Sequence, residues 1–323
     1  MKKAVTTSLF NFKNQVPTTA EWTKAFRLKN SLSPPRSTIA NPLITEKAMA
    51  AIKLKNPSQM TALEIYPGLG YWTRALSDIG FKRILSLETQ PHYNKWMQQS
   101  PIPQTEVIRK DGYNWETFID LKTPEYLGPL ENTDWSQVHQ DIFFTGTLPK
   151  GSRGEQLLVQ YCGCVLNKMA LHTLGRIQMA FWVPDVLFKK FMAPPGNPMR
   201  CKMSVIKELC VDVDLIYSTE AADMYPSTEY HLISLVPFAE NKLKSQWDVF
   251  EYVLKHLFVM QKRPLSHMVK TLGPGADIIL GRLSFSPDIL VGEMTAEQLD
   301  EVAIKFDQWP LRPRVLFEDA NAY

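Results

Sequence analysis

The chain has 323 residues, a net charge of +3 and 45% hydrophobic residues. This composition is typical of a globular protein and excludes the disordered, collagen-like and disulfide-scaffold classes. No apolar run reaches the roughly 18 residues that a membrane-spanning helix needs, so no membrane partner is expected. The four cysteines form no CxxC pair. We therefore expect reduced thiols and no metal site.

The amino-terminal end is strongly basic. Residues 1–40 hold seven lysines and arginines against one acid, Glu21. This composition, without a long apolar stretch, fits either an organelle-import segment or an ordinary basic arm. We expect residues 1–36 to form such an arm and the folded part to begin near residue 37.

The segment Thr61–Gly70 is the most informative part of the sequence. It reads TALEIYPGLG, a short apolar strand that runs into a glycine turn, and Trp72–Ile79 then follows with helical spacing. The glycines let the backbone turn tightly and approach a ligand at the carboxyl end of a strand. A ligand site is therefore expected at Gly68 and Gly70.

Two further strands are followed by acids. Arg83–Leu87 leads into Glu88, 18 residues after Gly70, where a carboxylate can accept hydrogen bonds from ribose hydroxyls. A third strand, Glu106–Arg109, is followed by Asp111. Repeated strand–helix units predict an α/β fold with a parallel sheet and right-handed crossovers.

The order of these motifs resembles the ribosomal-RNA adenine dimethyltransferases, which bind S-adenosylmethionine. Within that family the sequence is similar to the mitochondrial transcription factor B branch, in its fungal form. The resemblance covers about residues 37–317, and it is also carried by Asp111–Trp115, Ala193–Gly196, Lys262–Leu265 and Gln308–Pro310. It implies a Rossmann-like S-adenosylmethionine-dependent methyltransferase fold with a small C-terminal all-helical domain.

The resemblance also implies the domain boundaries. A methyltransferase-like domain is expected over residues 37–240, the helical domain over 241–310 and a tail over 311–323. In the first domain, Leu157–Leu174 is expected to be a buried helix, and Ser204–Tyr217 and His231–Val236 to be strands. In the second, the pair Thr295 and Gln298 predicts a capping box at the start of a helix.

At the cofactor site the sequence departs from that of an active enzyme. The resemblance assigns a vestigial S-adenosylmethionine site to Tyr66, Gly68, Gly70, Glu88 and Asp111. Tyr66 stands where the family has glycine, and its ring should occupy space near the methionine part of the cofactor. The upstream family signature Gln-Asn-Phe-Leu is replaced here by 36–39, which reads RSTI. We therefore expect that no cofactor is required and that S-adenosylmethionine binding is weak or lost.

The catalytic motif departs from the family as well. The family's Asn-Leu-Pro-Tyr best matches Thr147-Leu148-Pro149-Lys150. Thr147 lacks the paired donor and acceptor of an amide, and Lys150 has no ring to stack on a base. We expect no working catalytic residues in this motif.

The resemblance implies that aromatic and basic side chains of this chain form a nucleic-acid interface. Tyr113 and Trp115, spaced i and i+2, could face one side of an extended segment and stack on unpaired bases, at about 1–3 kcal/mol each. The alternative is that both rings are buried under a loop. Phosphate contacts are expected from Arg153 and from the residues that flank a loop rich in proline and glycine: Lys189, Lys190, Arg200 and Lys202. The alternative for these is an ordinary solvated loop.

Three functions follow from the resemblance. The first is a mitochondrial transcription initiation factor of the matrix that binds the single-subunit mitochondrial RNA polymerase, helps to melt promoter DNA and holds the non-template strand. The second is an active ribosomal-RNA adenine dimethyltransferase, favoured by Glu88 and Asp111. The third is a non-enzymatic, RNA-binding ribosome assembly factor.

Overall fold

The computed structural model describes residues 36–99, 101–128, 130–314 and 316, so the expected arm lies almost wholly outside the described residues. The described chain divides into two compact units. The sheet unit contains the residues up to Leu157, Ala170–Phe188 and Asp212–Pro237, and the helical unit contains Leu158–Met169, Lys189–Val211 and the residues from Phe238 onward. Two segments before residue 240 therefore belong to the helical unit.

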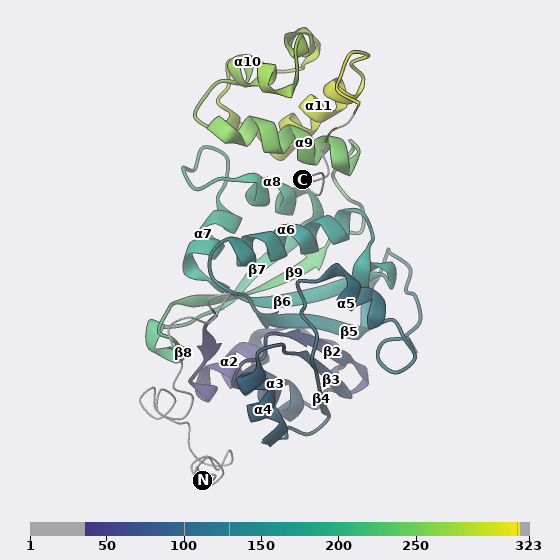
Figure 1. Cartoon of the computed structure of the whole chain (residues 1–323), viewed down its shortest axis with the longest axis vertical. Helices are drawn as coiled ribbons and strands as arrows, with labels where there is room; N and C mark the ends of the chain where they lie inside the picture. The colour runs from purple at the N-terminus through teal and green to yellow at the C-terminus, as the bar shows by residue number, and fades with distance from the viewer. Residues whose placement is uncertain (1–35, 100, 129, 315, 317–323) are drawn as a thin grey trace. The chain divides into compact units, whose positions relative to one another are not determined.

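Most of the sheet is parallel. In the described part of the chain it has seven strands in the order β4-β3-β2-β5-β6-β9-β7 (Figure 1). The parallel strands are β2 (Thr61–Ile65), β3 (Arg83–Leu87), β4 (Thr105–Ile108), β5 (Val138–Thr147) and β6 (Arg176–Pro184). β9 (Tyr230–Pro237) runs antiparallel to β6, and β7 (Val211–Ser218) lies beside it. This confirms the expected α/β fold.

A second, small sheet lies at the start of the described chain. It pairs β1 (Thr38–Ile39) antiparallel with β8 (Met224–Tyr225). This pairing fixes the backbone immediately after Arg36, which becomes important at the candidate site.

Helices of the sheet unit follow the strands as expected from the sequence. They are α2 (Pro42–Ala51), α3 (Tyr71–Asp78), α4 (Pro91–Gln99) and α5 (Trp115–Asp120), with 3-10 turns η1 (Pro57–Gln59), η2 (Ala170–Thr173) and η3 (Ala221–Asp223). α2 begins at Asn41, whose side chain accepts a hydrogen bond from the N–H of Leu43, and Pro42 follows where its missing N–H does no harm. α3 begins after Gly70, whose φ of +83° favours glycine.

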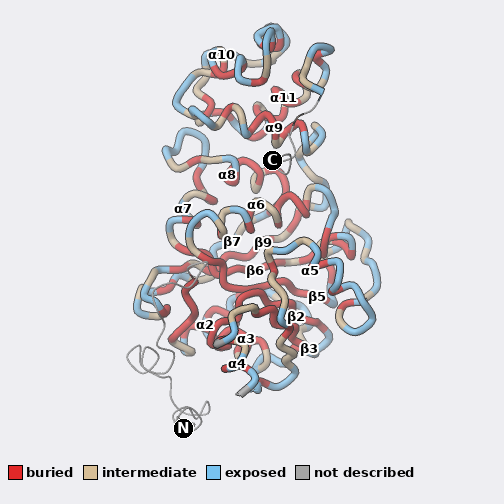
Figure 2. Tube along the Cα trace, in the orientation of Figure 1, coloured by how far each residue is buried: buried red, intermediate tan, exposed pale blue. Residues whose placement is uncertain are grey.

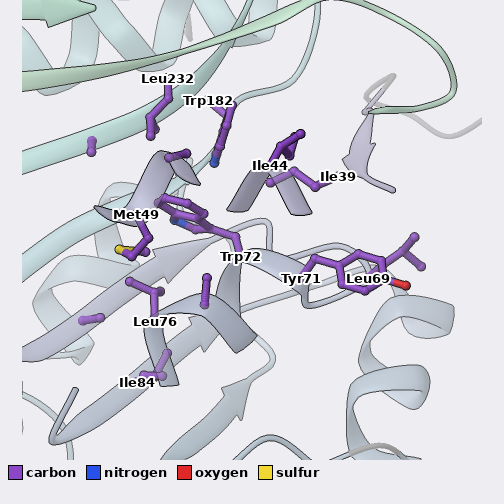
Figure 3. Close-up of a cluster of buried hydrophobic side chains, with 14 of the residues drawn as sticks. Ile39, Ile44, Met49, Leu69, Tyr71, Trp72, Leu76, Ile84, Trp182 and Leu232 are labelled. Carbon is purple, nitrogen blue, oxygen red and sulfur yellow. The ribbon is translucent and has the colours of Figure 1, made fainter. Parts of the chain in front are cut away.

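One face of the sheet carries a continuous apolar core formed with α2, α3 and α4 (Figure 3). Trp72 of α3 meets Trp182 of β6 edge to face, with ring centroids 5.4 Å apart. The Trp72 indole N–H donates to the hydroxyl of Thr145 at 2.8 Å, so its polar atom is satisfied in the core. The central strands are buried along most of their length (Figure 2), which fits strands covered on both faces.

The helical unit is built mainly from α8 (Lys202–Cys210), α9 (Trp247–Leu257), α10 (Leu265–Met268), α11 (Ala296–Asp307) and the 3-10 turns η4 (Phe258–Met260), η5 (Val269–Leu272), η6 (Ala276–Arg282) and η7 (Val291–Glu293). Tyr252 of α9 stacks on Phe306 of α11, with ring centroids 5.3 Å apart. The expected capping box is confirmed, because Thr295 and Gln298 exchange hydrogen bonds at the start of α11.

Two predicted elements were wrong in detail. Ser204–Tyr217 is not one strand, because α8 occupies its first half and β7 begins at Val211. Buried Met203, Ile206 and Cys210 lie on one face at helical spacing, which outweighs the strand preference of β-branched Val205 and Ile206. The helix predicted over Leu157–Leu174 is α6 (Ser152–Leu166), followed by a loop and η2. Another helix, α7, covers Asp185–Met192.

Within the described residues, no helix is both long and apolar enough to cross a membrane. In the same residues, no group of three or more histidine, cysteine or acidic side chains is arranged to hold a metal ion. Cys162, Cys164, Cys201 and Cys210 are all free thiols.

Candidate functional site

The carboxyl ends of four neighbouring parallel strands bring the predicted site residues together. Tyr66 follows β2, Glu88 follows β3, Asp111 lies three residues after β4, and Thr147 ends β5. In open α/β sheets this edge is where ligands bind. The sequence-based placement of the site on the sheet is therefore consistent with the topology.

Glu88 is fully engaged by a residue of the same chain. The guanidinium of Arg36 donates to both carboxylate oxygens of Glu88, at 2.8 and 2.6 Å, and the side chains are 4% and 0% exposed. The backbone N–H of Gln90 also donates to Glu88, at 2.8 Å. Burial by itself lowers the pKa of Arg36, but Glu88 outweighs it and raises the pKa above its ordinary value. This pair is therefore charged and bidentate, the strong form of such a contact.

Tyr66 occupies the position next to this pair. Its φ is +56°, in the left-handed region, where a residue other than glycine costs about 1–3 kcal/mol. The Arg36 guanidinium lies 4.6 Å from the centre of the Tyr66 ring. The phenol donates to Asp111 Oδ1 at 2.5 Å, and burial together with this bond raises the pKa of Tyr66 well above its ordinary value. The side chain is therefore held over its ring face by Arg36 and at its hydroxyl by Asp111.

Asp111 connects three neighbours. Oδ1 accepts from the Tyr66 phenol and from the backbone N–H of Tyr113, the latter at 3.0 Å. Oδ2 accepts from Arg153 at 2.8 Å. Both oxygens of this carboxylate thus have partners within the chain.

The glycine turn is covered by β1. The backbone N–H of Leu69 donates to the hydroxyl of Thr38 at 3.0 Å. Gly68 has a φ of +58°, and a Cβ at this position would lie 2.3 Å from the same hydroxyl oxygen. The turn approaches the chain's own β1 strand as closely as such turns approach a ligand.

These contacts test whether the site fits S-adenosylmethionine. A ribose needs the oxygens of Glu88, which Arg36 and Gln90 already use. The Tyr66 ring stands in the place that a glycine leaves open, and Thr38 accepts the Leu69 N–H of the turn. The residues as arranged do not fit the cofactor, because its polar partners are satisfied internally.

Glu64 is a buried carboxyl beneath this site, on β2. One of its oxygens accepts from the hydroxyls of Thr73 and Ser86, at 2.7 and 2.8 Å. Its other oxygen has no hydrogen-bond partner among the described residues. Burial raises the pKa of Glu64 to about 7, so the fold favours the neutral form of this carboxyl more than solvent does.

The diverged motif after β5 is tied into the structure. Leu148 donates its N–H to the carbonyl of Trp182 at 2.8 Å, and its own carbonyl accepts from the buried Tyr230 hydroxyl at 3.1 Å. Thr147, Leu148 and Pro149 are buried, so this backbone belongs to the core of the sheet unit. The Lys150 ammonium donates to the hydroxyl of Thr228, and burial lowers the pKa of Lys150. No aromatic ring stands at the end of the motif.

The predicted aromatic pair lies beside Asp111. Tyr113 is partly exposed, and the Arg153 guanidinium lies 3.8 Å from the centre of its ring. The Tyr113 hydroxyl donates to the side chain of Gln156 at 2.9 Å. Trp115 is partly exposed and is the first residue of α5. Neither ring is fully buried, so the alternative of two core aromatics does not describe them. Whether they contact nucleic acid stays a prediction.

The basic residues of the helical unit differ in exposure. Lys189 and Lys202 are exposed and Lys190 is partly exposed. Arg200 is only 1% exposed and donates to both oxygens of Glu208, at 2.7 and 2.9 Å, and to the carbonyls of Ala193 and Met294. We therefore correct the sequence-based assignment of Arg200, which holds the loop in place from inside instead of facing a phosphate.

Sequence reasoning missed two residues of the site, Arg36 and Thr38. A signal for both was present, because they stand in the segment that replaces Gln-Asn-Phe-Leu of the family. Arg36 is a cation in place of an amide there, and its partner Glu88 lies 52 residues further along the chain. Only the pairing of β1 with β8 shows where that segment lies.

Comparison with known proteins agrees with this fold and motif order. The family model described as ribosomal RNA adenine dimethylase matches residues 36–302. The chain belongs to the ribosomal RNA adenine dimethylase family. The chain is 25% identical to Mitochondrial transcription factor 1 of Saccharomyces cerevisiae, over 88% of the chain and 91% of the relative. It is 20% identical to the mitochondrial Dimethyladenosine transferase 1 of Vermamoeba vermiformis, over 93% and 96%.

Solved structures of dimethylase relatives share the fold. A dimethyladenosine transferase from Plasmodium falciparum matches with a TM-score of 0.60 and 14% identity, over 84% of this chain and 98% of that one. The 23S rRNA methyltransferase ErmE matches with a TM-score of 0.52 and 16% identity, over 84% and 100%. These likenesses confirm the expected Rossmann-like methyltransferase fold.

Proposed function

We propose that this member of the dimethylase family is a mitochondrial transcription initiation factor. It binds the single-subunit mitochondrial RNA polymerase, helps to melt the promoter and holds the displaced non-template strand. The observation that carries the proposal is the match to Mitochondrial transcription factor 1 of Saccharomyces cerevisiae along 88% of this chain and 91% of that protein. The names of these relatives also support a mitochondrial location, which we place in the matrix.

The geometry of the site supports the same function. The groups that hold a methyl donor in the family are used by Arg36, Tyr66 and Thr38, so methyl transfer loses its donor. The residues that could hold an unpaired nucleotide, Tyr113 and Arg153, lie partly exposed at the ligand-binding edge of the sheet. Stacking of a base on an aromatic ring is worth about 1–3 kcal/mol and tolerates any sequence. S-adenosylmethionine is not required for this role.

The direct test is promoter-dependent transcription by the purified mitochondrial polymerase, with and without this chain. The proposal expects initiation on duplex promoters to depend on the chain, and initiation on templates melted in advance to depend on it much less. S-adenosylmethionine should change neither result. Equal initiation with and without the chain on duplex DNA would contradict the proposal.

A second candidate is a ribosomal-RNA adenine dimethyltransferase, favoured by the match to the mitochondrial Dimethyladenosine transferase 1 of Vermamoeba vermiformis. That reaction needs a bound methyl donor and a held adenine. Methyl incorporation into small-subunit RNA by the purified chain would support it. Co-purification separates the remaining alternative, since ribosomal subunits without methyl transfer would indicate an assembly factor.

A further inference from the structure

Tyr66 keeps a conformation that a glycine would adopt without strain. Its φ of +56° is unfavourable for any side chain, and its ring lies 4.6 Å from the Arg36 guanidinium. Strained residues persist where the surroundings over-determine them, and they gather at functional sites. The phenol donates a hydrogen bond to Asp111. The role of Tyr66 therefore depends on the groups that Asp111 holds.

Asp111 holds both members of a stacked pair. One oxygen accepts from the backbone N–H of Tyr113 and the other from the Arg153 guanidinium. The same guanidinium lies 3.8 Å from the centre of the Tyr113 ring. Two of the groups that fix this pair, the Tyr66 phenol and the Asp111 carboxylate, come from the former cofactor site.

The stacked pair has the chemistry of a base platform. A guanidinium is flat, stays charged and stacks on aromatic rings, so Arg153 extends the surface of Tyr113 and adds charge that attracts phosphate. Arg153 is 31% exposed and Asp111 19% exposed, so the guanidinium can be reached from solvent. Single-strand binding proteins combine such stacking surfaces with positive charge.

We propose that Tyr66 is a positioning residue: its phenol fixes Asp111, which holds Arg153 against Tyr113 as one platform for an unpaired nucleotide. The inference rests on the proposed strand-holding function and adds a role for the residue that replaces the family's glycine. The former donor site then acts as the support of the nucleotide site.

The experiment measures binding of a single-stranded DNA oligonucleotide carrying 2-aminopurine, by fluorescence, at one fixed salt concentration and with the full chain. Tyr66→Phe removes the phenol oxygen and leaves the ring beside Arg36. Tyr252→Phe is the matched control, because it removes a buried phenol that donates to the carbonyl of Leu272 in the helical unit. Circular dichroism and the unfolding midpoint check that each variant folds.

We expect Tyr113→Ala to weaken binding roughly 5- to 150-fold, which corresponds to the stacking of one base. Tyr66→Phe should weaken it less, about 3- to 10-fold, because the lost hydrogen bond loosens Asp111 but removes no group that contacts the base. In the Tyr113→Ala background Tyr66→Phe should have no further effect, since it acts through that ring. Tyr252→Phe should bind like the wild type.

Other outcomes separate the two hypotheses. If Tyr113→Ala binds as tightly as the wild type, strand holding at this site is wrong and the platform is wrong with it. If Tyr113→Ala weakens binding and Tyr66→Phe does not, the function stands and the positioning role is overturned. Additive effects of Tyr66→Phe and Tyr113→Ala also overturn that role.

A second variant tests the platform without changing Tyr66. Arg153→Lys keeps the charge beside Asp111 and removes the flat guanidinium. We expect it to weaken binding by at least the factor seen for Tyr66→Phe and to reduce the 2-aminopurine stacking signal. Wild-type binding by Arg153→Lys would overturn the platform.

Discussion

Arg36 and Glu88, 52 residues apart in the sequence, face each other through two hydrogen bonds of 2.8 and 2.6 Å in the interior of the sheet unit. The acid that serves the ribose in the family is here the partner of an internal cation. The buried pair therefore links the first described residue to the sheet edge where the cofactor would bind.

Removing one member of this pair should be costly. We expect Arg36→Ala to lower the free energy of unfolding by about 3–5 kcal/mol, because Glu88 is left buried without its counter-charge. The double variant Arg36→Met with Glu88→Leu should recover most of this loss, since apolar replacements of both partners are often neutral. Urea unfolding of the three proteins measures this. A double variant as unstable as Arg36→Ala would show that the loss does not come from the unpaired charge.

Stability should fall as the pH rises, because of Glu64. Its pKa is raised from an ordinary 4.5 to about 7, so its contribution is complete below pH 4.5 and is lost as the pH rises through 7. This amounts to roughly 3 kcal/mol at 1.36 kcal/mol per pKa unit. Glu64→Gln keeps the shape and cannot ionise. The difference in unfolding free energy between the variant and the wild type should therefore grow from pH 4.5 to pH 8. A constant difference would count against the burial of a neutral carboxyl.

Calorimetry with S-adenosylmethionine should give no saturable heat, with any affinity weaker than about 1 mM. The physical reason is that the ribose must displace Arg36 from Glu88, and Tyr66 fills the space of the family's glycine. An active dimethyladenosine transferase titrated under the same conditions is the positive control. Saturable micromolar binding to this chain would show that the internal contacts open easily.

The aromatic pair should matter most where DNA must be opened. We expect Tyr113→Ala with Trp115→Ala to reduce initiation on duplex promoters roughly 10-fold or more, if each stacked base is worth about 1–3 kcal/mol. Templates melted in advance should be affected much less. The control, Tyr113→Phe with Trp115→Phe, keeps both rings and should stay active. An equal loss on both templates, or none, would rule out strand holding by this pair.

Arg200 and Lys202 are close in sequence, but their substitution should affect different properties of the protein. Arg200→Ala should lower the unfolding free energy by roughly 2–4 kcal/mol, less than for a fully buried pair because the Glu208 side chain is 25% exposed. The salt dependence of DNA binding by the folded fraction should not change. Lys202→Ala should leave stability unchanged and reduce the slope of log affinity against log salt by about 1. Denaturant unfolding and salt titrations distinguish the two. An unchanged slope for Lys202→Ala would remove it from the interface.

The sequence alone predicted the elements whose signals are local. The glycine turn after Thr61–Ile65, the acids after the next two strands and the Thr295 capping box each depend on a few neighbouring residues, and each lies where expected. The boundary between α8 and β7 was missed, because a run of branched apolar residues suits a buried strand and a buried helix alike.

Tertiary structure decided what the site residues do. Nothing local in the sequence joins Arg36 to Glu88 or Tyr66 to Asp111, because each contact depends on which segments fold side by side. An ion pair inside a protein is set by geometry and burial, and composition reports neither. The sequence could place a carboxylate at the edge of the sheet, but only the fold shows that the chain's own arginine already holds it.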